Sequence, residues 1–253
     1  MYANHFRADS HKPQWLKRRN STLLLREDKQ RKIIEKTYHA RYRVREEAEA
    51  YERLDHIIND LPHLRRPKIY LVDDVTNSLQ LEFVEGVDLL HEYGQHGSYV
   101  LQAWHDTLTK LLVNAHRNNV RFDADPSNFI VEHSKDCLAV IDPVAVDLDL
   151  DHFPVVVFLF GLIKCFIRYP RWWLRGKLLT IWYRYYSSYV QNSGCAWADL
   201  NRQLDHYIAT VIHWNYAESQ SEPFYKRLIR ILIIIPAWQL IRVPFKFNWV
   251  KTR

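Results

Sequence analysis

VRFDADPSNFIVEHSKDCLAVID, residues 120–142, is the stretch that most constrains the fold. It opens with an Asp-x-x-x-x-Asn element, Asp123 to Asn128, followed by two apolar runs around a polar turn, the second ending at Asp142. Apolar runs of this length on either side of a turn predict a pair of β-strands. Such a hairpin would bring an amide and two carboxylates together, a suitable set for holding magnesium and a nucleophile beside a phosphate.

The composition is that of a folded protein, because 47% of the 253 residues are apolar and 25% are charged. Only six glycines occur, and none forms a P-loop, a Gly-x-Gly-x-x-Gly fingerprint or a Gly-x-Ser-x-Gly elbow. We therefore expect none of these three kinds of site. The cysteines Cys137, Cys165 and Cys195 form no Cys-x-x-Cys pair, which favours a reducing compartment over a disulfide framework or a zinc site.

Upstream of residue 120, the pattern predicts a small antiparallel sheet with one helix. Apolar runs on both sides of a polar turn predict a β-hairpin with strands at 22–26 and 32–38. Helical spacing of apolar residues predicts a helix in 41–59. Two further strands are expected at 68–72 and 79–84. The resulting order is β-β-α-β-β.

Downstream of the sheet the pattern becomes helical. Residues 99–118 form a long amphipathic segment with its large apolar residues on one face. The apolar run 153–163 is shorter than the roughly 20 residues that a membrane-spanning helix needs. We therefore expect a buried helix there and no transmembrane span. Helical sequence rich in Trp and Tyr continues to residue 189, and 198–217 is expected to form another helix.

The two ends of the chain are basic. Residues 1–20 are expected to be a loosely held arm, and because they lack an apolar h-region the cytoplasm is the default location. From Phe224 onward there are seven Lys or Arg and no acid, interleaved with aromatic residues. Residues 224–253 are either a packed terminal helix with a solvated basic side or a peripheral contact with an anionic membrane surface. No nucleic-acid-binding module accompanies the charge, so nucleic acid is not expected.

The ordered set of motifs resembles the protein-kinase-like fold, an α+β fold with a small β-rich N-lobe and a mostly helical C-lobe. The kinase catalytic loop has Asp, Pro and Asn at the positions of Asp123, Pro126 and Asn128, followed by an apolar strand. Asp142 stands 19 residues after Asp123, where the family places its metal-binding Asp. The resemblance implies an N-lobe of residues 1–84 and a C-lobe of residues 85–253.

The short loop is most similar to that of the bacterial lipopolysaccharide core kinases, which phosphorylate heptose or Kdo sugars. Small-molecule kinases of the aminoglycoside and choline type are close relatives. The resemblance implies ATP and Mg²⁺ as cofactors and a sugar or lipopolysaccharide-core acceptor. It also implies that residues 224–253 would contact the inner face of a bacterial inner membrane. Asp123 would then accept or orient the proton of the attacking hydroxyl, and Asn128 and Asp142 would hold Mg²⁺.

The same resemblance implies a nucleotide site in the N-lobe. Lys36 would contact the ATP phosphates, held by either Glu47 or Glu52 of the helix; the local pattern favours Glu47. Glu82 lies on a segment similar to the hinge strand and would line the nucleotide site. Lys32 is an alternative to Lys36, but it opens the strand, where a solvated lysine is expected.

Several positions depart from the kinase pattern. Arg121 replaces the usual catalytic-loop His, and Pro143 and Val144 replace the Phe and Gly that usually follow the metal-binding Asp. No glycine-rich loop precedes the hairpin, so residues 19–22 would have to cover the phosphates. These departures leave a membrane-associated pseudokinase, acting as a binding or regulatory module, as an alternative. A protein Ser/Thr kinase is another, although little chain follows Asp142 for an activation segment.

A second acidic motif alternates with leucine at Asp147, Asp149 and Asp151. A solvated edge with Leu148 and Leu150 turned inward is the favoured interpretation, and a second metal site is the alternative. The thirteen histidines form no ligand pair at a recognised metal-binding spacing. We therefore expect no metal other than magnesium.

Overall fold

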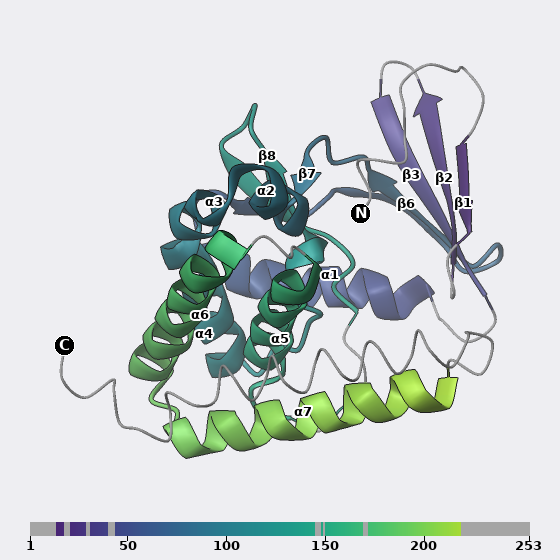
Figure 1. Cartoon of the computed structure of the whole chain (residues 1–253). Coiled ribbons are helices and arrows are strands. Elements are labelled where there is room, and N and C mark those ends of the chain that lie inside the picture. Colours follow the sequence, from purple (N-terminus) through teal and green to yellow (C-terminus); the bar gives the residue numbers. More distant parts are fainter. Residues whose placement is uncertain are drawn as a thin grey trace.

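The structure is a computed structural model. It describes the backbone of residues 14–17, 21–28, 31–39, 44–144, 148, 150–168 and 172–218, with side chains except at 14–17, 28, 164–168, 172–178 and 212–218. A β-sheet built from the N-terminal part of the chain stands beside a bundle of helices from the C-terminal part (Figure 1). The prediction of a two-lobed α+β architecture is confirmed.

The N-lobe sheet has five antiparallel strands in the order β1-β2-β3-β6-β5. Strands β2 and β3 form the predicted hairpin, with Ser21 opposite Tyr38. The bounds are β1 Gln14–Lys17, β2 Ser21–Asp28, β3 Arg31–Tyr38, β5 Ile69–Asp73 and β6 Ser78–Glu82. The expectation of a loose arm is wrong for residues 14–17, because these residues pair with β2 and extend the sheet.

Helix α1, Val44–Ile58, begins soon after β3 and packs on the sheet. Its residues Ala48 and Tyr51 are buried in one cluster with Leu79 and Leu81 of β6. The spacing of these apolar residues at one helical turn is the pattern that predicted the helix. Because α1 also contacts a helix of the other lobe, it is fixed from both sides.

A second sheet, in the order β4-β9-β8-β7, lies in the C-lobe. It contains the predicted hairpin of β8, Phe129–Glu132, and β9, Cys137–Val140. Two strands of two residues each complete it, β4, Leu64–Arg65, and β7, Val87–Asp88. Strand β4 precedes the last strands of the N-lobe in the chain yet pairs in parallel with β9. The segment after α1 is thereby anchored to the C-lobe.

The helical part contains α2, Leu89–His96, α3, Ser98–Ala103, α4, His105–Arg117, α5, Phe153–Arg168, α6, Trp172–Ser193, and α7, Trp197–Glu218. The expectation of one helix over 99–118 is wrong, because the chain breaks at Trp104, whose ψ of 5° is not helical. Neither Pro nor Gly marks that break in the sequence. The other predicted helices are present, at α5, α6 and α7.

Helix α5 lies at the centre of the C-lobe, between α6 and α7. Its residues 153–163 are all buried, as expected for a helix that is apolar on all sides. No helix within the described ranges is long and apolar enough to span a membrane. The core around α5 supports the loop that carries Asp123 and Asn128.

Candidate active site

A buried lysine joins the two lobes. Lys36 sits on β3 between β2 and β6, and only 7% of its surface is exposed. Its Nζ donates to Glu47 Oε2 of α1 at 2.7 Å and to Asp142 Oδ1, just after β9, at 2.7 Å. Sequence reasoning left Glu47 and Glu52 open as partners; Glu52 is exposed and Glu47 makes the ion pair.

Two tyrosines complete this group, and sequence reasoning missed both as site residues. The hydroxyl of Tyr38 donates to Glu47 Oε2. The hydroxyl of Tyr51 accepts from the backbone N–H of Asp142 at 3.1 Å. Tyr38 is two residues after Lys36 on a strand, and Tyr51 is four residues after Glu47 on a helix, so both spacings place them on the same face as their neighbours. We call Lys36, Tyr38, Glu47, Tyr51 and Asp142 the cleft cluster.

The charges of the cleft cluster keep Lys36 protonated. Burial lowers the pKa of Lys36, but the carboxylates of Glu47 and Asp142 outweigh burial and leave the pKa raised. Burial raises the pKa of Glu47, with the charge of Lys36 acting in the opposite direction. Burial and then the charge of Glu47 raise the pKa of Tyr38, so its hydroxyl remains a donor. The result is a fixed ammonium group at the junction of the lobes.

The loop from Asp123 to Asn128 is held by its own hydrogen bonds. Asp125 N–H donates to Asp123 Oδ1 at 3.1 Å, and Asp125 Oδ1 accepts from the N–H and hydroxyl of Ser127. This cap begins the single turn of 3₁₀ helix η1, Pro126–Asn128. Asn128 Nδ2 then donates to the carbonyl of Asp123 at 3.2 Å. The two residues predicted to act in transfer and metal binding are therefore tied to each other.

Asn128 and Asp142 meet at the end of the β8–β9 hairpin. Ile141 N–H donates to the carbonyl of Asn128 at 2.8 Å, so Asp142 directly follows this bridge. Asp142 itself has a φ of 54°, a left-handed conformation that Asp adopts more readily than most residues. Its N–H is available to Tyr51 in that conformation.

The donor set at this point fits magnesium. Asp142 supplies a carboxylate, and no hydrogen bond within the described part of the chain engages Asn128 Oδ1. Both are the hard oxygen ligands that Mg²⁺ prefers. No group of three or more His, Cys, Asp or Glu side chains in the described ranges is arranged to hold a metal. A magnesium ion here would therefore rely on phosphate or water oxygens for its other ligands.

Helix α5 packs directly against the loop, and α7 packs against α5. A Cβ on Gly161 of α5 would lie 2.2 Å from Pro126 Cδ, so glycine allows the helix to touch the loop directly. The ring of Tyr207, on α7, packs edge-on to Phe160 at a centroid distance of 5.3 Å. Burial, reinforced by the charges of Asp123 and Asp125, raises the pKa of Tyr207. Tyr207 thus lies near the loop, which its sequence position did not indicate.

Arg121, which replaces the usual catalytic-loop His, makes no hydrogen bond from its buried Nε and Nη2. Its guanidinium instead lies over the Phe153 ring, with Cζ 5.3 Å from the ring centroid. The loop is braced elsewhere, because Asp123 N–H donates to the carbonyl of Pro143 at 3.3 Å. This contact links Asp123 to Pro143, one of the positions at which the sequence departs from the kinase pattern.

A cleft of about 550 Å³, part of it open to solvent, lies between the lobes. Lys36 and Asp142 line it together with apolar residues of both lobes, Leu23, Ile34, Leu81, Ile130 and Ile141. Apolar walls with a few convergent polar groups are typical of small-molecule sites. Glu82 also lines this cleft, but its carboxylate bonds to Arg65 and to the N–H of Lys68. Asp123 and Asn128 do not line the cleft. Asn128 is linked to it through Ile141, which donates its N–H to the Asn128 carbonyl and directly precedes Asp142.

Lys32 is exposed and pairs with Glu85 at 3.3 Å, so it lies apart from the cleft cluster. Leu150 is buried and Asp151 is exposed, as expected for a solvated acidic edge. The structure does not describe residues 147, 149 and 224–253. It also does not describe residues 19 and 20 of the segment that was predicted to cover the phosphates.

Comparison with known proteins finds likeness in structure only. No protein-family model matches the chain, and no curated protein matches its sequence. Among solved structures, the chain is similar to one described as WaaP in complex with acyl carrier protein, with TM-score 0.46 and 13% identity over 77% of this chain and 88% of that one. It is also similar to an ethanolamine kinase from Plasmodium vivax, with TM-score 0.42 and 13% identity over 96% of this chain and 86% of that one. Both TM-scores are below 0.5, so function has to be inferred from the site itself.

Proposed function

We propose that the chain is an ATP- and Mg²⁺-dependent phosphotransferase that phosphorylates a hydroxyl of a sugar acceptor, of the kind found in the inner core of lipopolysaccharide. The observation that carries the proposal is the position of Lys36 Nζ, 2.7 Å from both Glu47 and Asp142, in a cleft between two lobes. A protonated lysine held by two carboxylates is poised to bind a phosphate oxygen. The Asp123–Asn128 loop next to Asp142 supplies the remaining groups that phosphoryl transfer needs.

In the proposed reaction the acceptor hydroxyl oxygen forms a bond to the γ-phosphorus of ATP, and the bond from that phosphorus to the β–γ bridging oxygen breaks. Asp123 orients the hydroxyl and takes its proton. Lys36 would hold the α and β phosphates. Asn128 and Asp142 would hold a magnesium ion, which would neutralise charge on the phosphate oxygens. Most of the catalysis is thus positioning and charge neutralisation.

The test compares two lysines on the same strand. Lys36→Met removes the buried ammonium of the cleft cluster, whereas Lys32→Met removes an exposed one that pairs with Glu85. Wild type should gain thermal stability with millimolar Mg²⁺-ATP, because a ligand that binds the native state raises the melting temperature. Lys36→Met should lose this shift and γ-phosphate transfer; Lys32→Met should keep both. Equal loss in both variants, or none in Lys36→Met, would overturn the assignment of the lysine.

The acceptor is tested separately from the nucleotide. Transfer should be measured to core-bearing lipopolysaccharide, to ethanolamine and choline, and to a generic protein substrate. Preference for the first supports the sugar acceptor, and the basic sequence of residues 224–253 suits an anionic, membrane-borne acceptor. Nucleotide binding without transfer to any acceptor would instead support a pseudokinase. Arg121 and Pro143, which depart from the kinase pattern, are the residues that favour this alternative.

A further inference from the structure

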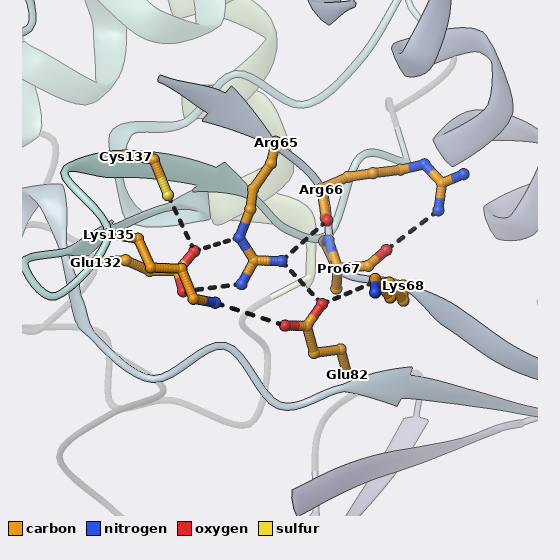
Figure 2. A network of polar contacts seen from close by, with 8 residues as sticks. All are labelled: Arg65, Arg66, Pro67, Lys68, Glu82, Glu132, Lys135 and Cys137. Carbon is orange, nitrogen blue, oxygen red and sulfur yellow. Dashed lines mark hydrogen bonds and ion pairs between the residues drawn. The ribbon is translucent and has the colours of Figure 1, made fainter. Parts of the chain in front are cut away.

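A second ion cluster joins the lobes beside the segment that connects them. Residues 83–86, between β6 and β7, are the hinge segment, and Glu82 ends β6 immediately before it. Figure 2 shows the Arg65 guanidinium between two carboxylates, Glu82 on one side and Glu132 on the other. Glu82 belongs to the N-lobe sheet and Glu132 to the C-lobe sheet. One side chain therefore bridges the two lobes.

The geometry of this bridge is specific to arginine. Arg65 donates to Glu132 from Nε at 2.5 Å and from Nη2 at 2.8 Å, a bidentate pair. Its third nitrogen, Nη1, donates to Glu82 Oε2 at 2.8 Å. All three nitrogens of one planar group are thus used, and a lysine could not reproduce this arrangement. Strand β4 carries Arg65 and is itself paired with β9, so the guanidinium extends from a fixed backbone.

Lys135, in the β8–β9 turn, is a second cation between the same carboxylates. Its Nζ lies 2.9 Å from Glu132 Oε2 and 3.8 Å from Glu82 Oε1. The thiol of Cys137 also donates to Glu132 Oε1 at 3.4 Å. Glu132, only 1% exposed, is therefore fully paired despite its burial. We call Arg65, Glu82, Glu132 and Lys135 the hinge cluster.

The cluster reaches the cleft through Glu82. This carboxylate accepts from the N–H of Lys68 as well as from Arg65, and the backbone N–H of Glu82 donates to the Lys68 carbonyl at 2.8 Å. The next residue, Phe83, donates its N–H to the carbonyl of Lys32 at 3.1 Å and lines the cleft. Holding the Glu82 carboxylate thus holds the start of the hinge segment. On the other side, a Cβ on Gly86 would lie 2.3 Å from the carbonyl oxygen of Val131, the residue next to Glu132.

We propose that Arg65 is a positioning residue for the nucleotide cleft: by binding Glu82 and Glu132 together it fixes the hinge segment against the C-lobe and so sets the distance between the cleft walls. The proposal rests on the proposed function, because it takes the cleft as the ATP site. Two lobes joined by a hinge can open and close around a ligand. An ion cluster across the hinge restricts that motion to the width at which the cleft residues of both lobes meet the nucleotide.

Arg66 provides a matched control. It follows Arg65, is similarly half-buried (22% against 23%), and forms a bidentate pair with Asp55 at 2.7 and 2.5 Å. Asp55 lies on α1, and this pair contacts neither Glu82 nor Glu132. Arg65→Met and Arg66→Met therefore each remove one half-buried bidentate arginine, and only the first cuts the bridge to the hinge.

The experiment measures Mg²⁺-ATP binding by titration calorimetry, and amide hydrogen exchange of residues 82–88 in the nucleotide-free protein. Arg65→Met should raise the Kd about tenfold, the size of one charge-assisted link, and should speed exchange in the hinge segment. Arg65→Lys should give an intermediate Kd, because it keeps the charge without the bidentate contact. Arg66→Met should leave both readouts as in wild type, although its melting temperature falls.

Each outcome separates the two proposals. If wild type binds nucleotide and Arg65→Met binds equally well, the positioning role is wrong and the proposed function stands. Equal weakening in Arg65→Met and Arg66→Met would show a general loss of stability and also overturn the role. If wild type binds no nucleotide, the proposed function fails, and the hydrogen exchange of residues 82–88 still decides whether Arg65 holds the hinge. Should Arg65→Met fail to fold, Arg65→Lys supplies the same comparison with Arg66→Met.

Discussion

The cleft cluster and the hinge cluster both join the lobes through ion pairs, but their charge balance differs. The cleft cluster sets one cation, Lys36, against the carboxylates of Glu47 and Asp142. The hinge cluster sets two cations, Arg65 and Lys135, against two carboxylates. The first has an excess of negative charge that a bound cation would balance, whereas the second is complete in itself.

The two clusters also differ in how they connect the lobes. The cleft cluster links β3 and α1 to Asp142, which takes a left-handed backbone conformation. The hinge cluster links regular strands, β6 and β8, through Arg65 on β4. Backbone in a sparsely populated conformation is typical of sites that change with their ligand. We therefore expect the cleft cluster to govern chemistry and the hinge cluster to govern the shape of the cleft.

The largest expected effect follows from Glu47→Gln. This change removes the charge that holds the Lys36 ammonium in a buried position, and also weakens the acceptor of Tyr38. A hydrogen bond to a charged group contributes about 1.5–3 kcal/mol, which corresponds to a loss of roughly 10- to 100-fold in phosphoryl transfer. Steady-state kinetics with Mg²⁺-ATP would measure it.

Glu52→Gln is the control for this prediction. Glu52 lies on the same helix but is exposed, so its variant should transfer phosphate at the wild-type rate. A similar loss from both variants would mean that the charge of α1 as a whole matters, and not the contact with Lys36. That result would remove the distinction between a specific cleft cluster and a generally acidic helix.

Much of the cleft cluster could be predicted from the sequence because its parts are local. The hairpin of β2 and β3, the helix α1 and the 120–142 stretch each have a period or a turn that is visible in a short window. Lys36 and Glu47 are 11 residues apart, within one strand-helix unit. The pairing of Lys36 with Glu47 was inferred from the family resemblance, and the contact of Lys36 with Asp142, across 106 residues, was not predicted.

The hinge cluster could not be predicted in this way. Arg65 lies 17 residues from Glu82 and 67 from Glu132, and the strands that bring them together are two to five residues long. A two-residue strand such as β4 has no periodicity to recognise, and its partner β9 comes later in the chain. The break at Trp104 was missed for a related reason. No Gly or Pro stands at the break, and Trp104 at that position packs against the C-lobe core.

A smaller effect is expected from Tyr51→Phe, which tests the backbone of the cleft cluster. The change removes the hydroxyl that accepts from Asp142 N–H at 3.1 Å and leaves the ring in place. One neutral hydrogen bond contributes about 1 kcal/mol, so we expect roughly a fivefold higher Mg²⁺ requirement for transfer. Magnesium titration of the transfer rate would measure this.

Tyr185→Phe is the matched variant for Tyr51→Phe. The Tyr185 hydroxyl is also buried and donates to a backbone carbonyl, that of Leu101 at 2.7 Å, in the C-lobe core. Its loss should lower the melting temperature by a comparable amount without changing the magnesium requirement. If both variants need more magnesium, Asp142 is held by the fold in general and not by Tyr51.

The smallest effect concerns the hinge cluster and its dependence on pH. Burial tends to raise the pKa of Glu132, but the hydrogen bonds from Arg65 and Lys135 outweigh it and lower the pKa below the usual 4.5. The pKa of Glu82 is also lowered, because the bonds from Arg65 and from Lys68 N–H outweigh burial. A carboxyl whose pKa is lower in the folded protein stabilises the fold above pH 4.5 and loses this contribution as pH falls through the folded pKa.

The gap in melting temperature between wild type and Arg65→Met should therefore be widest near neutral pH and should narrow below pH 4.5. In Arg65→Met the carboxylates of Glu82 and Glu132 lack their main cation. Protonating these carboxylates therefore costs the variant less stability than it costs wild type. We expect a gap of a few degrees at pH 7, since about 1 kcal/mol corresponds to 2–4 °C in a chain of this size. Differential scanning calorimetry between pH 3 and 8 would measure it. A gap that stays constant across this range would mean that Arg65 stabilises the protein through its packing and not through its ion pairs. The hinge cluster would then differ from the cleft cluster in the type of interaction that joins the lobes, as well as in charge balance.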